Sequence, residues 1–209
     1  MKHVTLLLLL LSSWQSQANI TNWTKALTDE KITVYSRPQH TSALSEFKAV
    51  VTIEANIQQA IDLITNTEAS SQWLAHCAGT TLLEQPHSNQ ALVYTVINTP
   101  WPLSDRDTVV NFTFNQQANG GMHILMQGKP AYLPKQDDRV RIPKLTGAWT
   151  LEPLTAHKVR ITYQLSLDPG GNSPAWLVNE FSQQGMYDTL ANLRTVLLQG
   201  DRPINLAMQ

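Results

Sequence analysis

The stretch Val159-Arg-Ile-Thr-Tyr-Gln-Leu-Ser-Leu-Asp-Pro-Gly-Gly-Asn-Ser-Pro-Ala-Trp176 joins a strand pattern to a helix pattern. From Val159 to Leu167 apolar and polar residues alternate, which is typical of a strand with one buried and one solvated face. The residues that follow form a loop, in which Ser173 is expected to cap a helix that begins at Pro174. We therefore expect a half-buried strand followed directly by a helix.

The helix that follows this strand is predicted to be long and amphipathic. It runs from about Pro174 to Leu198, which corresponds to ~37 Å at the helical rise per residue. Glu180 and Asp188 are among the polar residues on one side of it. The opposite side carries an apolar stripe of Val178, Phe181, Met186, Leu190, Leu193 and Leu197.

Period-two patterns upstream predict further strands, and two helical segments interrupt them. Asn56 is expected to cap a helix over residues 57–66, and a second helical turn is expected over 68–74. Asn119-Gly120 is a strong signal for a tight hairpin. The expected strands are 32–36, 45–54, 80–84, 91–98, 108–115, 122–127, 148–152 and 159–167.

This order of elements predicts an α+β fold. A curved antiparallel sheet wraps around the long C-terminal helix, and short helices follow the second strand. A sheet with one solvated face must bury the other, and the C-terminal helix is the available cover. Because a helix is narrower than the concave face of such a sheet, space between the two is expected.

Several groups of residues occur in a characteristic order along the chain. They are Trp23, Lys31–Arg37, Glu46-Phe-Lys-Ala, Trp73, Leu92–Val96, Trp101-Pro-Leu-Ser-Asp-Arg-Asp107, Leu167-Asp-Pro-Gly-Gly and Pro174-x-Trp176. Together they resemble the START domain, the lipid-binding branch of the helix-grip, Bet v 1-like superfamily. The resemblance covers about Trp23 to Leu198, and the Trp-Pro-x-Ser-Asp-Arg-Asp segment is its most specific part. It implies a deep hydrophobic tunnel between sheet and helix that holds one lipid-sized ligand.

The candidate ligand-binding residues are the alternate strand residues whose side chains point inward and residues of the apolar stripe on the helix. A binding tunnel needs apolar area and few polar groups. The alternative is that the same side chains pack into a filled core. The candidates are Val93, Thr95, Ile97, Arg106, Val110, Phe112, Met126, Trp149, Tyr163 and Leu165 on the strands, and Phe181, Met186 and Leu190 on the helix.

The resemblance also separates this chain from the sterol-carrying animal members of the family. Those members bury an acid–arginine pair in the tunnel, and alignment on Arg106 places the pair at Val93 and Phe112. Both residues are apolar here, so a sterol hydroxyl would lack that hydrogen-bond partner. Acyl-chain or polyisoprenoid ligands are therefore at least as compatible with the sequence.

The segment from Thr99 to Val110 carries two prolines, which we expect to hold it extended. Arg106 and Val110 are four residues apart, so their side chains should point to the same side of an extended segment. Arg106 should therefore face the cavity, near one end of the cavity. A charge there must be paired or hydrogen-bonded. Arg106 is either a structural brace or a direct ligand contact, whereas Asp105 in the turn can accept from backbone amides.

The first 18 residues predict a secretory signal peptide. One lysine precedes the apolar run Leu6–Leu11, and small residues Ser16 and Ala18 follow it. Residues 19–200 then form the START-like domain and 201–209 a C-terminal tail. The product is expected to be exported, either periplasmic or secreted. Its single cysteine, Cys77, precludes an intrachain disulfide and is interpreted as an inert buried thiol.

These features predict a carrier of one lipid or other hydrophobic molecule. A net charge of −1 without a basic run excludes a nucleic-acid partner, and no protein partner is indicated. The six histidines show no metal-ligand spacing, so no metal site is expected. The sequence has no Gly-x-Ser-x-Gly elbow, phosphate-binding glycine loop or dinucleotide fingerprint, so neither a cofactor nor a catalytic residue is expected.

Two alternatives remain beside the carrier. The first is a cavity enzyme of the same superfamily that uses Tyr94, Tyr163, Asp105 and Arg106. The second is a protein-interaction module. Exposed aromatic residues on loops suit a membrane interface. The candidates for a lid with transient membrane contact are Trp101, Tyr132 and Trp176.

Overall fold

The computed structural model of the chain describes residues 22–29, 31–39 and 42–199. The predicted signal peptide, residues 1–18, and the predicted tail, residues 201–209, lie outside the described residues. None of the described helices is both long enough and apolar enough to cross a membrane.

Ten strands and three helices make up the described part of the chain. In chain order they are β1 (Thr24–Thr28), β2 (Ile32–Gln39), β3 (Ser42–Ile53), α1 (Ile57–Thr65), α2 (Ser70–Trp73), β4 (Cys77–Glu84), β5 (Gln90–Ile97), β6 (Arg106–Gln116), β7 (Met122–Gly128), β8 (Val140–Arg141), β9 (Lys144–Thr155), β10 (Lys158–Asp168) and α3 (Ala175–Gln199).

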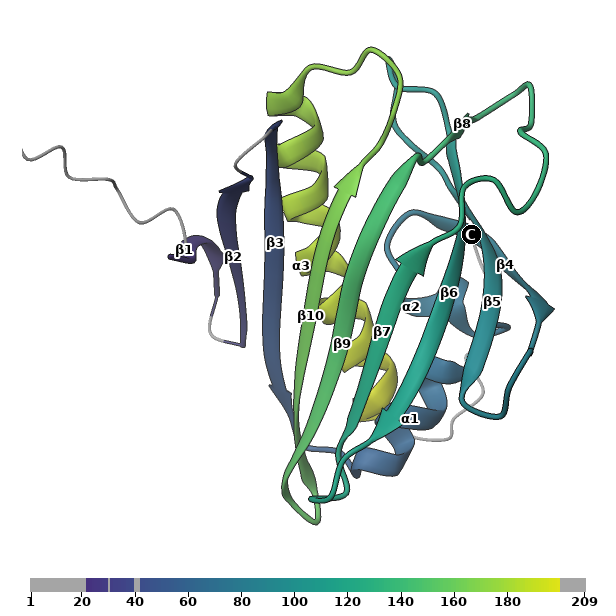
Figure 1. Cartoon of the computed structure of the whole chain (residues 1–209). Coiled ribbons are helices and arrows are strands. Elements are labelled where there is room, and N and C mark those ends of the chain that lie inside the picture. Colours follow the sequence, from purple (N-terminus) through teal and green to yellow (C-terminus); the bar gives the residue numbers. More distant parts are fainter. Residues whose placement is uncertain (1–21, 30, 40–41, 200–209) are drawn as a thin grey trace, which may run out of the picture.

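The strands form one sheet in the order β1-β2-β3-β10-β9-β7-β6-β5-β4, with antiparallel neighbours throughout. The two residues of β8 pair with β6 in parallel. The sheet curves around α3, which crosses its concave side (Figure 1). The predicted α+β fold, with a curved sheet around a long C-terminal helix and short helices after the second long strand, is confirmed.

The strands and helices predicted from the sequence are present, with several bounds shifted. β1 and β8 were not predicted, since neither has a period-two pattern long enough to recognise. α3 begins at Ala175, and the amide of Val178 donates to the carbonyl of Pro174 at 3.1 Å. Pro174 is therefore the cap residue, not Ser173 as expected.

Of two local signals in the sequence, the helix cap at Asn56 is confirmed and the turn at Asn119-Gly120 differs in detail. Asn56 caps α1 as predicted, and its side chain and that of Gln59 form a capping box. The β6–β7 connection is longer than the expected two-residue hairpin, because Gln117 N donates to Gly121 O at 2.9 Å. Only Gly120 of that turn takes a positive φ, 81°.

The helices cover the concave face unevenly. α3 packs on β2 and β3, whereas α1 and α2 lie against β9 and β4 and reach α3 from the other side. Trp73 of α2 meets Trp149 of β9 edge-on, with ring centroids 5.7 Å apart. The main core lies between α3 and the β2–β3–β10 part of the sheet, where Val34, Ala49, Ile161 and Leu190 are completely buried.

A buried ion pair fixes a long loop to the opposite, convex face of the sheet. Arg141 donates to both carboxylate oxygens of Asp107, at 2.8 and 2.9 Å. Its three remaining N–H groups donate to the carbonyls of Pro130, Leu133 and Pro134. All five guanidinium donors are therefore used, and residues 129–139 are anchored over this face.

Asp107 is held as a carboxylate by its partners. Burial alone would raise the pKa of Asp107, but hydrogen bonds from Arg141 and Tyr94 outweigh it and lower the pKa below the ordinary value. A carboxyl with a depressed pKa contributes stability above the pKa of the unfolded chain, about 3.9, and loses it as pH falls.

Replacing Asp107 by asparagine should lower the free energy of unfolding by about 3–5 kcal/mol at neutral pH, because Arg141 stays buried without its counter-ion. Urea denaturation would measure the change. Removing one side of the exposed Arg160–Glu152 pair, by Glu152→Gln, should cost less than about 1 kcal/mol. As the pH falls below about 4, the free energy of unfolding should decrease less in Asp107→Asn than in the wild type, because the variant has no carboxylate at this position to protonate. Equal losses in the two variants would contradict the assignment.

Candidate functional site

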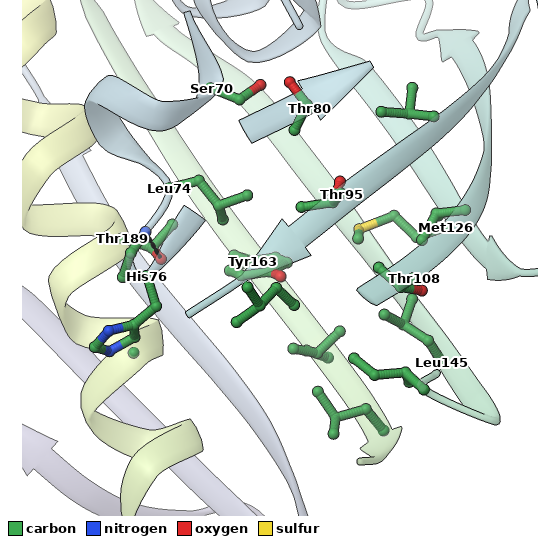
Figure 2. Close-up of a pocket in the computed structure, with 18 of the residues that line it drawn as sticks. Ser70, Leu74, His76, Thr80, Thr95, Thr108, Met126, Leu145, Tyr163 and Thr189 are labelled. Carbon is green, nitrogen blue, oxygen red and sulfur yellow. Dashed lines mark hydrogen bonds between the residues drawn. The ribbon is translucent and has the colours of Figure 1, made fainter. Parts of the chain in front are cut away.

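A cavity of about 210 Å³ lies between the sheet and the helices. A single buried water needs only about 10–15 Å³ of such space. The cavity can therefore hold a molecule of many atoms. Its walls come from α1, α2 and α3 on one side and from β4 to β7, β9 and β10 on the other. In Figure 2, Tyr163 lies between Thr189 and His76 on the helical side and Thr95 and Thr108 on the strands.

Most of the predicted ligand-binding residues line this cavity. They are Val93, Thr95, Ile97, Arg106, Val110, Phe112, Met126, Trp149, Tyr163, Leu165, Phe181 and Met186. Leu190 is the exception, since it is completely buried in the core beside the cavity. It turns toward the strands on which α3 packs, and Thr189 takes the cavity-facing position in that helical turn.

The wall also contains residues that sequence reasoning did not select. Thr108 lies between Arg106 and Val110 on the inward face of β6, so the parity that selected those two residues could have found it. The contributions of α1 and α2 had no sequence signal, because they depend on where the two short helices pack. The main additions are Ile64, Ser70, Trp73, Leu74, His76, Thr80, Thr108, Ile142, Leu145 and Thr189.

The β5–β6 pair forms a graded strip along the wall. Residues opposite each other on neighbouring antiparallel strands share a face. The inward pairs are, in order, Ile97–Arg106, Thr95–Thr108, Val93–Val110 and Ala91–Phe112. The strip therefore changes from charged to hydroxyl-bearing to purely apolar along one direction.

Tyr163 is held rigidly at the centre of the cavity wall. Its ring stacks on Trp149 with centroids 3.9 Å apart and planes only 5° from parallel. Burial raises the pKa of the Tyr163 hydroxyl, so the group is neutral at physiological pH. It can donate or accept one hydrogen bond inside the cavity.

His76 stands at the border between the cavity and solvent. It lines the cavity but is itself exposed. Its φ of 60° is the one positive value outside glycine in the described chain. The imidazole stacks on Phe181 of α3 at 4.5 Å between centroids. The turn between α2 and β4 is thereby fitted against the middle of α3.

Arg106 closes one end of the cavity and joins two loops. One terminal nitrogen donates to Ser173 Oγ at 2.8 Å in the β10–α3 loop. The other donates to the Ser104 carbonyl and to Thr99 Oγ1 in the β5–β6 loop. Only 4% of Arg106 is exposed, and within the described residues its Nε has no hydrogen-bond partner. These contacts join the two loops as a structural brace would.

The β5–β6 loop differs from the extended segment that its prolines predicted. The Leu103 amide donates to the Pro100 carbonyl at 3.0 Å, so these residues form a turn, and the Trp101–Pro102 bond is cis. Asp105 accepts from the Thr99 amide at 2.9 Å, which confirms its expected role in the turn.

The three lid candidates lie on three segments of the chain. Trp101 is 92% exposed and Trp176 is 67% exposed, on the loop and helix start that meet at the Arg106 end of the molecule (Figure 1). Tyr132 belongs to the loop that Arg141 anchors over the convex face, and its hydroxyl donates to Glu84.

The four residues considered for a cavity enzyme do not meet. Arg106 and Tyr163 line the cavity, but Tyr94 lies on the other face of the sheet, where its hydroxyl donates to Asp107 at 2.9 Å. Asp105 is held in the turn. The described residues also contain no group of three His, Cys, Asp or Glu side chains placed to hold a metal ion.

Known proteins resemble this chain along most of its length. A family model described as the START domain matches residues 10–199. An uncharacterized protein of Pseudomonas aeruginosa is 31% identical over 174 residues, which are 83% of this chain and 86% of that protein. The crystal structure of a STAR-related lipid transfer protein from Xanthomonas axonopodis is 34% identical, covers 85% of this chain and 99% of its own, and superposes with a TM-score of 0.78.

A more distant likeness extends to animals. The phosphatidylcholine transfer protein of Rattus norvegicus is 20% identical over 184 residues, which are 82% of each chain. Together with the family match and the Xanthomonas structure, it supports a lipid-binding role.

Arg106→Ala should lower the free energy of unfolding by on the order of 2 kcal/mol, because it removes charge-assisted hydrogen bonds that join two loops. Ser173→Ala removes one of these bonds and should cost about half as much. Thermal and urea unfolding of both variants would measure the two changes. An Arg106→Ala protein with an unchanged melting temperature would show that Arg106 is not a brace.

Proposed function

This chain belongs to the START domain family, and from that premise we propose that it binds one lipid or comparable hydrophobic molecule inside the cavity and carries or shields it. The observation that carries the proposal is the cavity itself, about 210 Å³ of space walled mainly by apolar side chains. A filled core would leave no such space, since protein interiors pack at near-crystalline density.

Partition of hydrocarbon from water supplies the binding energy. Removing ~300 Å² of ligand hydrocarbon from water is worth on the order of 7 kcal/mol before the costs of association. Val93 and Phe112 both line the wall. They make it apolar at the two positions where the sterol-carrying animal members of the family bury an acid–arginine pair. This composition favours a ligand with an acyl or isoprenoid chain over a sterol.

We further propose that the protein is exported and takes up its ligand at a membrane. The export assignment rests on the apolar run Leu6–Leu11 and the small residues that follow it. The lid consists of the two loops that meet at the Arg106 end, one bearing Trp101 and the other leading to Trp176. Both indoles are exposed there, and amphipathic rings of this kind suit a membrane–water interface.

Protein purified from its native host should carry up to one extractable lipid per chain, detected by mass spectrometry of an organic extract. Val110→Trp fills the cavity from β6 and should reduce the extracted lipid by about tenfold or more, because the core cannot expand to admit the larger ring. Leu125→Trp alters an exposed position on the convex face and should retain the lipid. Wild-type protein without extractable lipid, and without uptake of added lipid, would contradict the proposal.

The membrane contact can be measured separately by flotation with phosphatidylcholine–phosphatidylglycerol vesicles. Trp101→Ala combined with Trp176→Ala should lower the bound fraction at least about threefold, because two interfacial aromatic anchors are lost. Leu125→Ala, which removes an exposed apolar side chain from the convex face, should have no effect. Unchanged flotation of the double variant would remove these residues from the docking surface.

A further inference from the structure

We propose that the ligand is a single-chain amphiphile with an anionic head group, a carboxylate or phosphate, bound by Arg106 with its hydrocarbon chain directed along the β5–β6 strip. This inference rests on the proposed function and names the class of ligand. It starts from a mismatch between the charge of Arg106 and its surroundings.

Arg106 is a buried cation without a counter-ion in the described structure. Its partners there are the oxygens of Ser104, Thr99 and Ser173, which are all uncharged. No described carboxylate lies within the 4.0 Å limit of an ion pair, and no acidic residue lines the cavity. Burying an unpaired charge is costly. A ligand anion would remove that cost.

The nearby acidic groups form their hydrogen bonds with other residues, although the charge of Asp105 lies near enough to act on Arg106. The Asp105 carboxylate accepts from the Thr99 amide. Asp107, the next residue along β6, points to the convex face and is paired with Arg141. Asp107 is therefore the counter-ion of Arg141 and not of Arg106.

Two further features increase the demand for an anion at this point. Ser173, the partner of Arg106, immediately precedes the N-terminal cap of α3, where the helix dipole carries partial positive charge. The positive end of the α3 dipole therefore adds to the cost of burying the Arg106 charge. In addition, the Nε of Arg106 has no hydrogen-bond partner within the described residues, although neighbouring atoms cover it, so a head group reaches it only after a small movement of the side chain. Arginine binds carboxylate or phosphate best through two parallel N–H donors.

The graded strip sets the direction of the bound chain. The Thr95–Thr108 pair lies next to Arg106 and can donate to the oxygens of a head group. Beyond it, Val93, Val110 and Phe112 present only hydrocarbon. Six residues of strand separate Arg106 from Phe112, which corresponds to ~20 Å. An extended acyl chain is comparable in length.

The wall of the cavity is matched to one chain and one head group. It offers a single cation, Arg106, at one end and a single graded strip that leads away from it. A fatty acid or an alkyl phosphate satisfies the charge and the graded wall together.

The test compares the affinities of delipidated protein for palmitate, hexadecyl phosphate and the neutral hexadecanol by displacement of a neutral fluorescent probe. We expect at least one anion to bind about tenfold or more tightly than hexadecanol, since the charge-assisted contact is unavailable to the alcohol. Whether palmitate or hexadecyl phosphate is preferred identifies the anion as carboxylate or phosphate. Acetate and inorganic phosphate serve as anions without a chain.

Variants at Ile97 provide the decisive control, because this side chain faces Arg106 directly across the strand pair. Ile97→Glu supplies an internal carboxylate and should abolish the preference for the anion while hexadecanol still binds. Ile97→Gln has nearly the same shape as Ile97→Glu without the charge, so it controls for the loss of the isoleucine, and its preference for the anion should exceed that of Ile97→Glu by about tenfold or more. Arg106→Gln should lose it, and Arg160→Gln, which removes an exposed charge from the convex face, should keep it.

Each result has one reading. Equal affinity of the wild type for palmitate, hexadecyl phosphate and hexadecanol would overturn the inference and leave the proposed function standing. Failure of all three to bind, and of the probe, would overturn the proposed function itself. Displacement of palmitate by acetate or inorganic phosphate at comparable concentrations would show that the site binds simple anions. That result would contradict the proposal that the ligand is an amphiphile. If Arg106→Gln does not fold, the comparison of Ile97→Glu with Ile97→Gln decides alone.

Discussion

The concave face of the sheet is wider than the single long helix available to cover it, and the rest of the architecture follows from this constraint. α3 packs on β2 and β3, so the inner faces of β5 and β6 need another cover. The short helices α1 and α2 complete the enclosure but do not fill it. The space that remains is the cavity, and the side chains of β5 and β6 that would otherwise pack against a helix face a void.

Successive residues of one strand give the two faces of the sheet different roles, because neighbouring side chains point in opposite directions. Asp107 meets Arg141 on the convex face, where all five guanidinium donors find acceptors and a loop is held in place. Arg106 points inward, where it ties two loops through uncharged oxygens and its Nε has no partner within the described residues. The first arrangement is complete without a ligand. The second leaves the guanidinium without an ion-pair partner among the described residues.

Much of the candidate site could be predicted from the sequence because strand parity is a local property. The alternation in residues 159–167 placed Tyr163 and Leu165 inside, and the same rule placed Val93, Val110 and Phe112 there. The rule was weaker on α3, whose apolar stripe serves two surfaces. Leu190 belongs to the side that packs on the sheet, whereas the polar Thr189 faces the cavity. Hydrophobicity alone therefore selected the wrong residue of that turn.

The sequence by itself determined the order of the three helices and of eight of the ten described strands, the amphipathic strand before α3, the faces of those strands and the family signature around Arg106. These follow from periods of two and 3.6 residues and from turn residues, which act over short distances along the chain. Only the tertiary structure decided that Asp107 pairs with Arg141, 34 residues away, that the wall includes α1 and α2, and that none of the described carboxylates forms an ion pair with Arg106. The physical reason is that charge pairing and cavity shape depend on which distant segments the folded chain brings together. No local pattern records those distances.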